Sequence, residues 1–262
     1  MELRAVLLVC VLLAACQKEK SSSPGAEQRI VAVAAASDLK FALEDVLTGF
    51  RGKHPDIRVE PTYGSSGNFF AQLQNRAPFD VFFSADVSYA MRLIEGGQAR
   101  RGSEFIYAHG RLVLWAPAGS KVDVEKLGMA ALLEPEVRKV AIANPQHAPY
   151  GRAAEAAIKK AGFYDRVSPK LVLGENIAQT AQFVESGSVD VGLIALSLAL
   201  GGSMKGKGRY WEVPEYEHPT LEQAGVILTW AKDPGAAEEL RAFVMAPEGR
   251  SILERYGFVI PN

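Results

Sequence analysis

Cysteine is scarce in this sequence, and its two cysteines, Cys10 and Cys16, both stand close to the N-terminus. The four histidines are scattered, and the Cys and His residues do not show the spacing typical of a transition-metal site. Charge of one sign is not in excess either, since 29 Lys and Arg are balanced by 30 Asp and Glu. This balance argues against the strongly basic surface typical of nucleic-acid-binding proteins. We therefore expect no nucleic-acid partner, no resident metal and no cofactor, and any charged ligand must be bound locally.

The N-terminus also lacks a hydrophobic run long enough for a permanent membrane span. The apolar run from Ala5 to Ala15 follows Arg4 and is short, which indicates a signal peptide over residues 1–15. It ends in Leu-Ala-Ala-Cys and resembles a bacterial lipobox, so we expect Cys16 to be lipidated and to begin the mature protein. An ordinary signal peptide cleaved near Ala15 is the alternative. Residues 16–28, rich in Ser, Lys and Glu, are expected to form a tether, and no disulfide is expected.

From Ile30 onwards, short apolar strands alternate with amphipathic helical patterns, which is typical of an α/β fold with parallel strands. In the first unit, residues 30–35 are predicted to be a buried strand, and a helix is predicted to follow Ser37 as its N-cap. Helices are expected between the strands, and two more after the last one. The segment 201–208 is expected to be a flexible loop, because Gly208 stands where a phosphate-binding loop requires Ser or Thr. Further strands are predicted over residues 57–63, 80–84, 112–115, 140–143, 171–173, 191–194 and 224–230.

Small polar turns open helices at four places in this pattern. The first N–H groups of a helix have no partners inside it and carry about half a unit of positive charge. Several such turns around one cleft therefore form a site for a compact anion without any lysine or arginine. Each turn taken alone is better explained by ordinary helix capping, but four of them in two parts of the chain favour a cleft. The turns are Ser37, Ser65-Ser66, Tyr150-Gly151 and Glu175-Asn176-Ile177.

Enzyme motifs receive little support. A secreted serine hydrolase that uses Ser66 is an alternative, but the G-x-S-x-G spacing of a nucleophile elbow is missing around this residue. The histidines are expected at the surface or in loops. Asp80 and Asp86 flank a strand and could be paired carboxylates, although capping and hinge roles are favoured. We therefore expect no catalytic residue and no enzymatic activity.

Five segments together carry a resemblance to a known family. They are Ala34-Ala35-Ala36-Ser37, Tyr63-Gly64-Ser65-Ser66, the Ala-Pro-x-Asp-x-x-x-Ser-Ala-Asp stretch 77–86, the stretch 144–151 and Tyr256-Gly257-Phe258. These segments resemble the periplasmic molybdate-binding proteins of ABC importers, which are type II periplasmic solute-binding proteins. The similarity extends from about Arg29 to the C-terminus.

The resemblance implies a two-lobed periplasmic-binding-protein fold of the α/β class. Each lobe would be a mixed sheet flanked by helices, and hinge closure would trap the ligand in the cleft between the lobes. Lobe one would comprise residues 29–110 and 217–262, and lobe two would comprise residues 111–216.

The resemblance also implies which residues bind the oxyanion. Ser37 and Ser66 would donate hydroxyl and backbone hydrogen bonds from lobe one. The backbone N–H groups of Tyr150 and Ile177 would donate from lobe two. A carrier with such neutral donors would discriminate against sulfate by cavity size, because a smaller anion cannot satisfy all fixed donors at once.

Two positions depart from the family pattern. Some members place a tyrosine hydroxyl in the site where this chain has Ala195, so that one donor is missing or is supplied elsewhere. Asp38 follows the first serine, and a carboxylate facing a dianion would weaken binding. We expect Asp38 to cap its own helix start, with only its backbone N–H facing the ligand.

The resemblance implies an extracytoplasmic lipoprotein that captures molybdate and tungstate. It would deliver the anion to a membrane permease driven by a cytoplasmic ATPase, acting as a monomer held by its lipid on the periplasmic or cell-surface side of a membrane. A binding protein for another small oxyanion and an anion sensor that docks on a membrane receptor are alternatives. The sequence does not rank molybdate against tungstate, because the two anions are nearly equal in size and charge.

Overall fold

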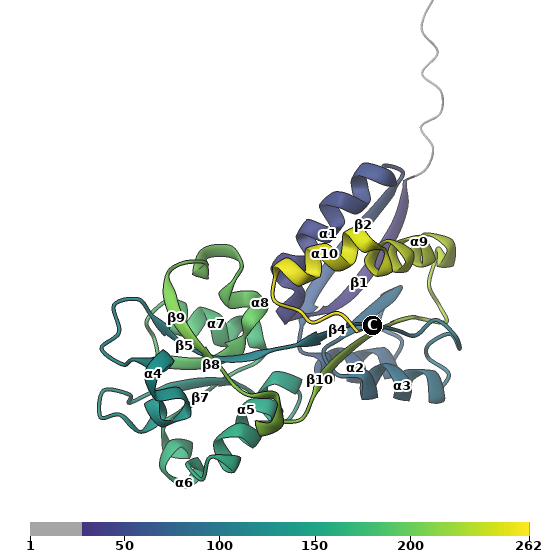
Figure 1. Ribbon diagram of the computed structural model, residues 1–262. Coiled ribbons are helices and arrows are strands. Elements are labelled where there is room, and N and C mark those ends of the chain that lie inside the picture. The colour runs from purple at the N-terminus through teal and green to yellow at the C-terminus, as the bar shows by residue number, and fades with distance from the viewer. Residues whose placement is uncertain (1–27, 262) are drawn as a thin grey trace, which may run out of the picture.

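The protein is described over residues 28–261 by a computed structural model, which contains two five-stranded mixed sheets side by side (Figure 1). We call each sheet with its covering helices a lobe. The predicted signal peptide, the predicted lipidation site Cys16 and most of the predicted tether lie outside the described residues. Among residues 28–261, no helix is both long and apolar enough to cross a membrane.

The first lobe is built on a sheet in which parallel and antiparallel pairs are combined. Strand β1 pairs in parallel with β2 and β3, whereas β10 is antiparallel to both β3 and β4. The order across the sheet is β2 (Ile57–Gly64), β1 (Arg29–Ala36), β3 (Val81–Ser84), β10 (Leu221–Ile227) and β4 (Phe105–Gly110). The helices of this lobe are α1 (Lys40–Lys53), α2 (Ser66–Gln74), α3 (Val87–Glu95), α9 (Pro234–Met245) and α10 (Pro247–Arg255).

Helices cover both faces of the first sheet, which explains why its central strands are largely apolar on both faces. Successive residues of a strand point to opposite faces. Val33 and Ala35 of β1 accordingly belong to a core with α1, α9 and α10, whereas Ala34 belongs to a second core with α2 and α3.

The second lobe has the same mixed character. Strand β6 pairs in parallel with β7 and β8, and β5 is antiparallel to β8 and β9. The order is β7 (Leu171–Gly174), β6 (Val140–Ala143), β8 (Val191–Ala195), β5 (Leu112–Pro117) and β9 (Gly208–Glu212). Its helices are α4 (Val124–Leu127), α5 (Pro149–Lys160), α6 (Tyr164–Val167), α7 (Ile177–Glu185) and α8 (Leu196–Ala199). Short 3-10 helices are η1 (Ser37–Leu39), η2 (Gly128–Leu133), η3 (Ser168–Lys170), η4 (Gly202–Met204) and η5 (Glu215–Glu217).

The chain passes twice between the two sheets. Strand β4 ends at Gly110 in the first sheet, and β5 begins at Leu112 in the second. The chain returns between Glu212, the end of β9, and Leu221, the start of β10. Both passages lie where the lobes meet in Figure 1.

Several predicted elements are corrected by the structure. Strand β10 ends at Ile227. Leu228 then forms an isolated bridge with Ala99, and residues 229–230, predicted to belong to the strand, are a turn. Part of the predicted loop 201–208 is the 3-10 helix η4, and Gly208 begins strand β9. The sequence pattern also missed β4, whose residues alternate between buried and exposed in only part of the strand.

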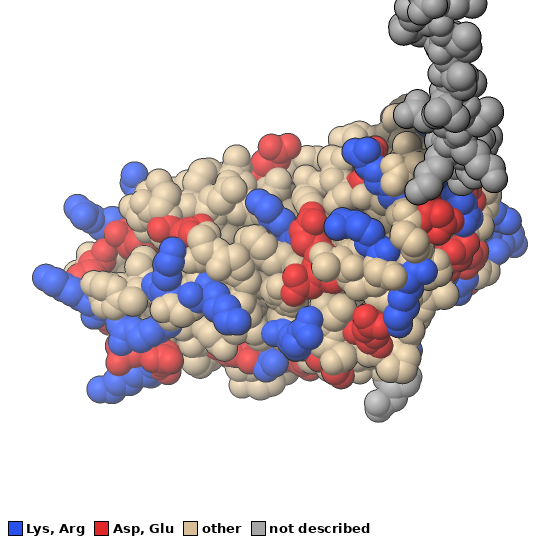
Figure 2. Space-filling view, turned by 90° about the horizontal axis from the view of Figure 1, so that it is seen from above, with Lys and Arg blue, Asp and Glu red and all other residues tan. Residues whose placement is uncertain are grey.

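The surface agrees with the balanced composition. Figure 2 shows basic and acidic side chains interspersed over the face seen from above, across both lobes. On this face, Lys and Arg do not gather into an extended patch.

Candidate functional site

Four parallel strands end at the junction of the lobes. In the first sheet the last residues of β1 and β2, Ala36 and Gly64, are paired in register. In the second sheet the last residues of β6 and β7, Ala143 and Gly174, are paired in the same way. Each strand is followed by a short turn and the start of a helix, so both lobes direct helix N-termini towards the same place.

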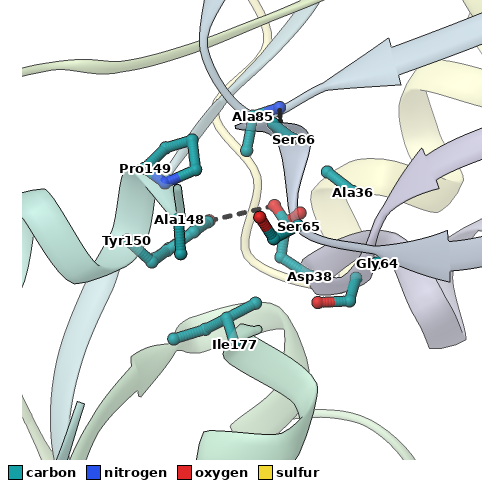
Figure 3. A pocket seen from close by; sticks show the side chains of 11 residues that line it. Ala36, Asp38, Gly64, Ser65, Ser66, Ala85, Ala148, Pro149, Tyr150 and Ile177 are labelled. Carbon is teal, nitrogen blue, oxygen red and sulfur yellow. Dashed lines mark hydrogen bonds between the residues drawn. The ribbon is translucent and has the colours of Figure 1, made fainter. Parts of the chain in front are cut away.

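These turns enclose a small cavity lined by residues of both lobes (Figure 3). All four residues predicted to bind the ligand are among its eleven lining residues, and lysine and arginine are not. The cavity is narrow, with about 10 Å³ of space for the centre of a water-sized sphere. The lining residues are Ala36, Ser37, Asp38, Gly64, Ser65, Ser66, Ala85, Ala148, Pro149, Tyr150 and Ile177. The structure thus brings the predicted residues together, while their contact with a ligand stays a prediction.

Ser37 links the two lobes and does not cap a helix as the sequence predicted. Helix α1 begins at Lys40, and neither it nor η1 has a side-chain N-cap. The buried Ser37 hydroxyl instead donates to Asn176 Oδ1 over 3.2 Å and accepts from the N–H of Ala178 over 3.3 Å. Asn176 is itself the N-cap of α7, since its Oδ1 accepts from the N–H of Gln179. Ser37 therefore lies between the first lobe and the start of α7.

Ser66 is buried at the first position of α2. Its Oγ accepts from the N–H of Ala85 over 2.9 Å, and this is its one hydrogen bond to the described residues. The hydroxyl hydrogen is therefore free to donate to a ligand. The neighbouring Ser65 is the N-cap of α2, which satisfies one of the free N–H groups of this helix start.

The turn that contains Ser65 is fastened to the loop before α5 in the second lobe. Ser65 Oγ lies 2.9 Å from His147 Nδ1 and 2.8 Å from the His147 carbonyl oxygen, to which it donates. The N–H of Gly67 donates to the same carbonyl oxygen over 2.9 Å. A Cβ atom at Gly67 would lie 2.5 Å from that oxygen, so only glycine permits this approach.

The Ser65–His147 pair lacks, among the described residues, two features of a serine-hydrolase triad. Among residues 28–261, His147 forms no ion pair with a carboxylate that could orient it as a general base. Ser66, the nucleophile of the hydrolase alternative, forms no hydrogen bond with a histidine in the described chain. Asp86 is the N-cap of α3, a role favoured by the sequence, whereas Asp80 accepts from the backbone N–H groups of Ala32 and Lys232 and caps no helix.

Asp38 faces the cavity, and the prediction that it caps its own helix is wrong. Its side chain is 1% exposed, and its Oδ2 accepts from Gln223 Nε2 over 2.6 Å and from the Tyr150 hydroxyl over 3.1 Å. Figure 3 shows the bond from Tyr150 of the second lobe. Burial raises the pKa of Asp38 from 3.8 to about 6, although the hydrogen bonds from Gln223 and Tyr150, and to a smaller extent the backbone N–H groups of Asp38 and Leu39, act in the opposite direction.

The partners of Asp38 form a buried network that sequence reasoning missed. The Tyr107 hydroxyl donates to Gln223 Oε1 over 2.8 Å, which orients the Gln223 amide group towards Asp38. Gly110 at the end of β4 leaves room for this arrangement, since a Cβ atom there would overlap the Tyr150 hydroxyl oxygen. A buried glutamine within an apolar strand was the available signal, but its partners lie on distant segments.

Tyr150 and Ile177 lie in the first turns of α5 and α7. Tyr150 follows Pro149 at the start of α5, and Ile177 is the first residue of α7. The N–H groups at these positions have no acceptor within their own helices, and the helix dipoles favour negative charge here. Ala195 ends β8 and is fully buried, so it adds no polar group to the site.

A second contact between the lobes lies beside the cavity. Arg152 of α5 pairs with Asp86 at the start of α3 over 2.5 Å and donates to the Tyr89 hydroxyl over 3.2 Å. Together with the contacts of Ser37 and His147, this ion pair joins the two lobes to each other.

Comparison with known proteins identifies the family. Residues 31–259 match the family model of bacterial extracellular solute-binding proteins. The molybdate-binding protein ModA of Rhodobacter capsulatus is 36% identical over 236 residues, 90% of each chain. The putative ABC transporter substrate-binding lipoprotein YvgL of Bacillus subtilis is 26% identical over 97% of this chain and 95% of the relative.

The solved structure of the Azotobacter vinelandii periplasmic molybdate-binding protein is also similar. It matches with a TM-score of 0.83 and 31% identity over 88% of this chain and 100% of that one. The expected fold of two mixed sheets flanked by helices is thereby confirmed. The chain belongs to the bacterial extracellular solute-binding protein family, in the group of the molybdate-binding proteins.

Proposed function

We propose that this protein captures molybdate outside the cytoplasmic membrane and delivers it to the permease of an ABC importer. The observation that supports this most directly is the cavity itself, in which hydroxyl groups and helix starts of both lobes meet around a compact space. Relatives named molybdate-binding proteins, similar over most of the chain, support the choice of ligand. Tungstate is included in the proposal because it is nearly the same in size and charge.

The donor set suits capture and release of a tetrahedral dianion. Ser37 and Ser66 would donate from the first lobe, and the N–H groups of Tyr150 and Ile177 from the second. The donors would contact the oxygens of the anion, and the lining of the cavity holds no fixed cation that would retain it. A smaller anion such as sulfate would leave some fixed donors unpaired, and each unpaired buried donor costs about 1 to 3 kcal/mol.

The remaining parts of the proposal concern the setting of the protein. A lipid on Cys16 would hold it at the outer side of a membrane, and the resemblance to a relative named as a lipoprotein supports this. The segments near Gly110 and Tyr216 that join the lobes would be the hinge. The protein would act as a monomer, without a cofactor and without catalysis of its own.

Isothermal titration of the purified protein with four oxyanions tests the ligand assignment. We expect tight binding of molybdate and tungstate and little heat with sulfate or phosphate. If neither molybdate nor tungstate produces heat, the ligand assignment is wrong. Binding of sulfate or phosphate alone would instead identify the protein as a carrier of another oxyanion.

A further inference from the structure

Asp38 places an acceptor where a bound anion would need a donor. The two oxygens of its carboxyl group have different surroundings. Oδ2 accepts hydrogen bonds from Gln223 and Tyr150, whereas Oδ1 is buried and has no hydrogen-bond partner among the described residues. The residue lines the same cavity as Ser37 and Ser66. An orphaned carboxylate oxygen in such a place is costly unless something donates to it.

Within the described part of the chain, the side chains that hydrogen-bond Asp38 carry no positive charge. Gln223 of β10 and Ser197 of α8 are neutral, and the latter donates to the Asp38 carbonyl oxygen over 2.7 Å. The titratable groups that contact this network are the Tyr107 and Tyr150 hydroxyls, whose pKa is raised well above the usual range by burial, so both stay neutral.

Other charged or titratable groups near the cavity contact other partners. His147 hydrogen-bonds Ser65, and Arg152 is paired with Asp86. Lys40 lines a neighbouring hollow of the cleft together with Ser37. Within residues 28–261, none of these three side chains forms an ion pair or hydrogen bond with Asp38.

A doubly charged oxyanion in the cavity would therefore meet a carboxyl oxygen with no hydrogen between them. Two acceptors repel each other unless one proton lies between them. Burial has already raised the pKa of Asp38 to about 6, and a nearby dianion would raise it further. Protonation would turn Oδ1 from a repelling acceptor into a hydrogen-bond donor, while Oδ2 keeps its bonds to Gln223 and Tyr150.

We propose that Asp38 Oδ1 and an oxygen of the bound oxyanion share one proton, so that capture of the dianion takes up one proton from solvent. The proposal rests on the proposed function, because it assumes an oxyanion in this cavity. The proton belongs to the pair and is not assigned to either oxygen. The protonated Asp38 would then supply a donor in place of the tyrosine hydroxyl that this chain lacks at Ala195.

Titration of the whole protein with molybdate, in buffers of different ionisation enthalpy, counts the protons taken up on binding. Above about pH 7 we expect uptake of about one proton per anion, and affinity should fall about tenfold for each further pH unit. Asp38→Asn is the informative variant, because its amide oxygen can accept from Gln223 and Tyr150 while its NH₂ group donates into the cavity. This variant should bind molybdate without proton uptake and with little dependence on pH.

His147→Gln is the matched control, since His147 is the titratable side chain nearest to Ser65 at the cavity wall. Proton uptake should persist in this variant.

Infrared difference spectra of the wild type provide a measurement independent of variant folding, with a protonated-carboxyl C=O band expected to appear on binding. Binding without proton uptake, uptake that persists in Asp38→Asn, or uptake lost only in His147→Gln would overturn the proposal. If the wild type fails to bind molybdate at every pH tested, the proposed function fails as well, which distinguishes the two failures.

Discussion

The ligand-free protein should become more stable when Asp38 is replaced by asparagine, and only at a pH where Asp38 is charged. Asp38 is fully buried and its pKa rises from 3.8 to about 6 on folding. At about 1.4 kcal/mol per unit, this shift corresponds to about 3 kcal/mol of destabilisation once the carboxyl is ionised in both states. The substituted amide keeps the shape of the side chain and the acceptor for Gln223 and Tyr150 without the charge. We therefore expect Asp38→Asn to gain up to about 3 kcal/mol at neutral pH.

The sign of the pH dependence follows from the direction of the shift. Between pH 3.8 and about 6 the folded state holds the Asp38 proton more tightly than the unfolded state, so stability falls as pH rises through this window. Urea unfolding of wild type and variant at several pH values measures the difference. The gain should be small near pH 4 and constant above about pH 7. A difference that does not change across this window would refute the assignment of a buried, shifted carboxyl.

Asp233 offers a control of opposite sign for the same measurement. Arg29 pairs with Asp233 over 2.6 Å, and mainly this bond lowers the pKa of Asp233 to about 2. Its stabilising contribution is therefore present at neutral pH and is lost as pH falls through about 2. Asp233→Asn should destabilise the protein at neutral pH, where Asp38→Asn stabilises it. Because the Asp233 side chain is partly exposed to solvent, which screens the ion pair, the effect should be small.

Three further predictions concern the ligand, closure and the anchor. Ser37→Ala combined with Ser66→Ala should weaken molybdate binding by about 2 to 6 kcal/mol in calorimetry, since each donor to a charged ligand contributes about 1.5 to 3 kcal/mol; unchanged affinity would show that these are the wrong residues. Gly67→Ala should lower affinity about tenfold or more by pushing its Cβ against the His147 carbonyl oxygen, with the open-sited Gly52→Ala as the control that leaves affinity unchanged. Cys16→Ala should release the protein from the membrane fraction, as immunoblotting of fractions would show, and persistent membrane association would contradict the lipid anchor.

Local patterns predicted most of the secondary structure, because each interior strand or helix shows its hydrophobic pattern in its own residues. Strand β6 has the predicted bounds, because its short apolar run has distinct ends. Edge strands were harder to predict from the sequence. Residues of β9 are only half-buried along the whole strand, and β4 is recognised by its pairing with β10, more than a hundred residues away in the chain.

The candidate site was predictable in composition but not in geometry. The turn motifs indicated Ser37, Ser66, Tyr150 and Ile177, and the structure places them around one cavity. The role of Asp38 was predicted wrongly, because capping is a local interaction whereas its partners Gln223 and Tyr150 are distant in sequence. The sequence around such an Asp does not show whether its side chain caps its own helix or hydrogen-bonds residues that are distant in the chain.

The same hydroxyl that would bind the anion also holds the lobes together, which links capture to closure. Ser37 donates to Asn176 across the junction, so donation to an anion would cost that bond. Asn176 Oδ1 would still accept from the N–H of Gln179, and it would not be left unpaired. A hydrogen bond to a neutral group is worth about 0.5 to 1.5 kcal/mol and one to a charged group about 1.5 to 3 kcal/mol. At Ser37 the exchange therefore favours the anion-bound form by only a modest amount, which leaves an importer that opens the lobes able to release the anion.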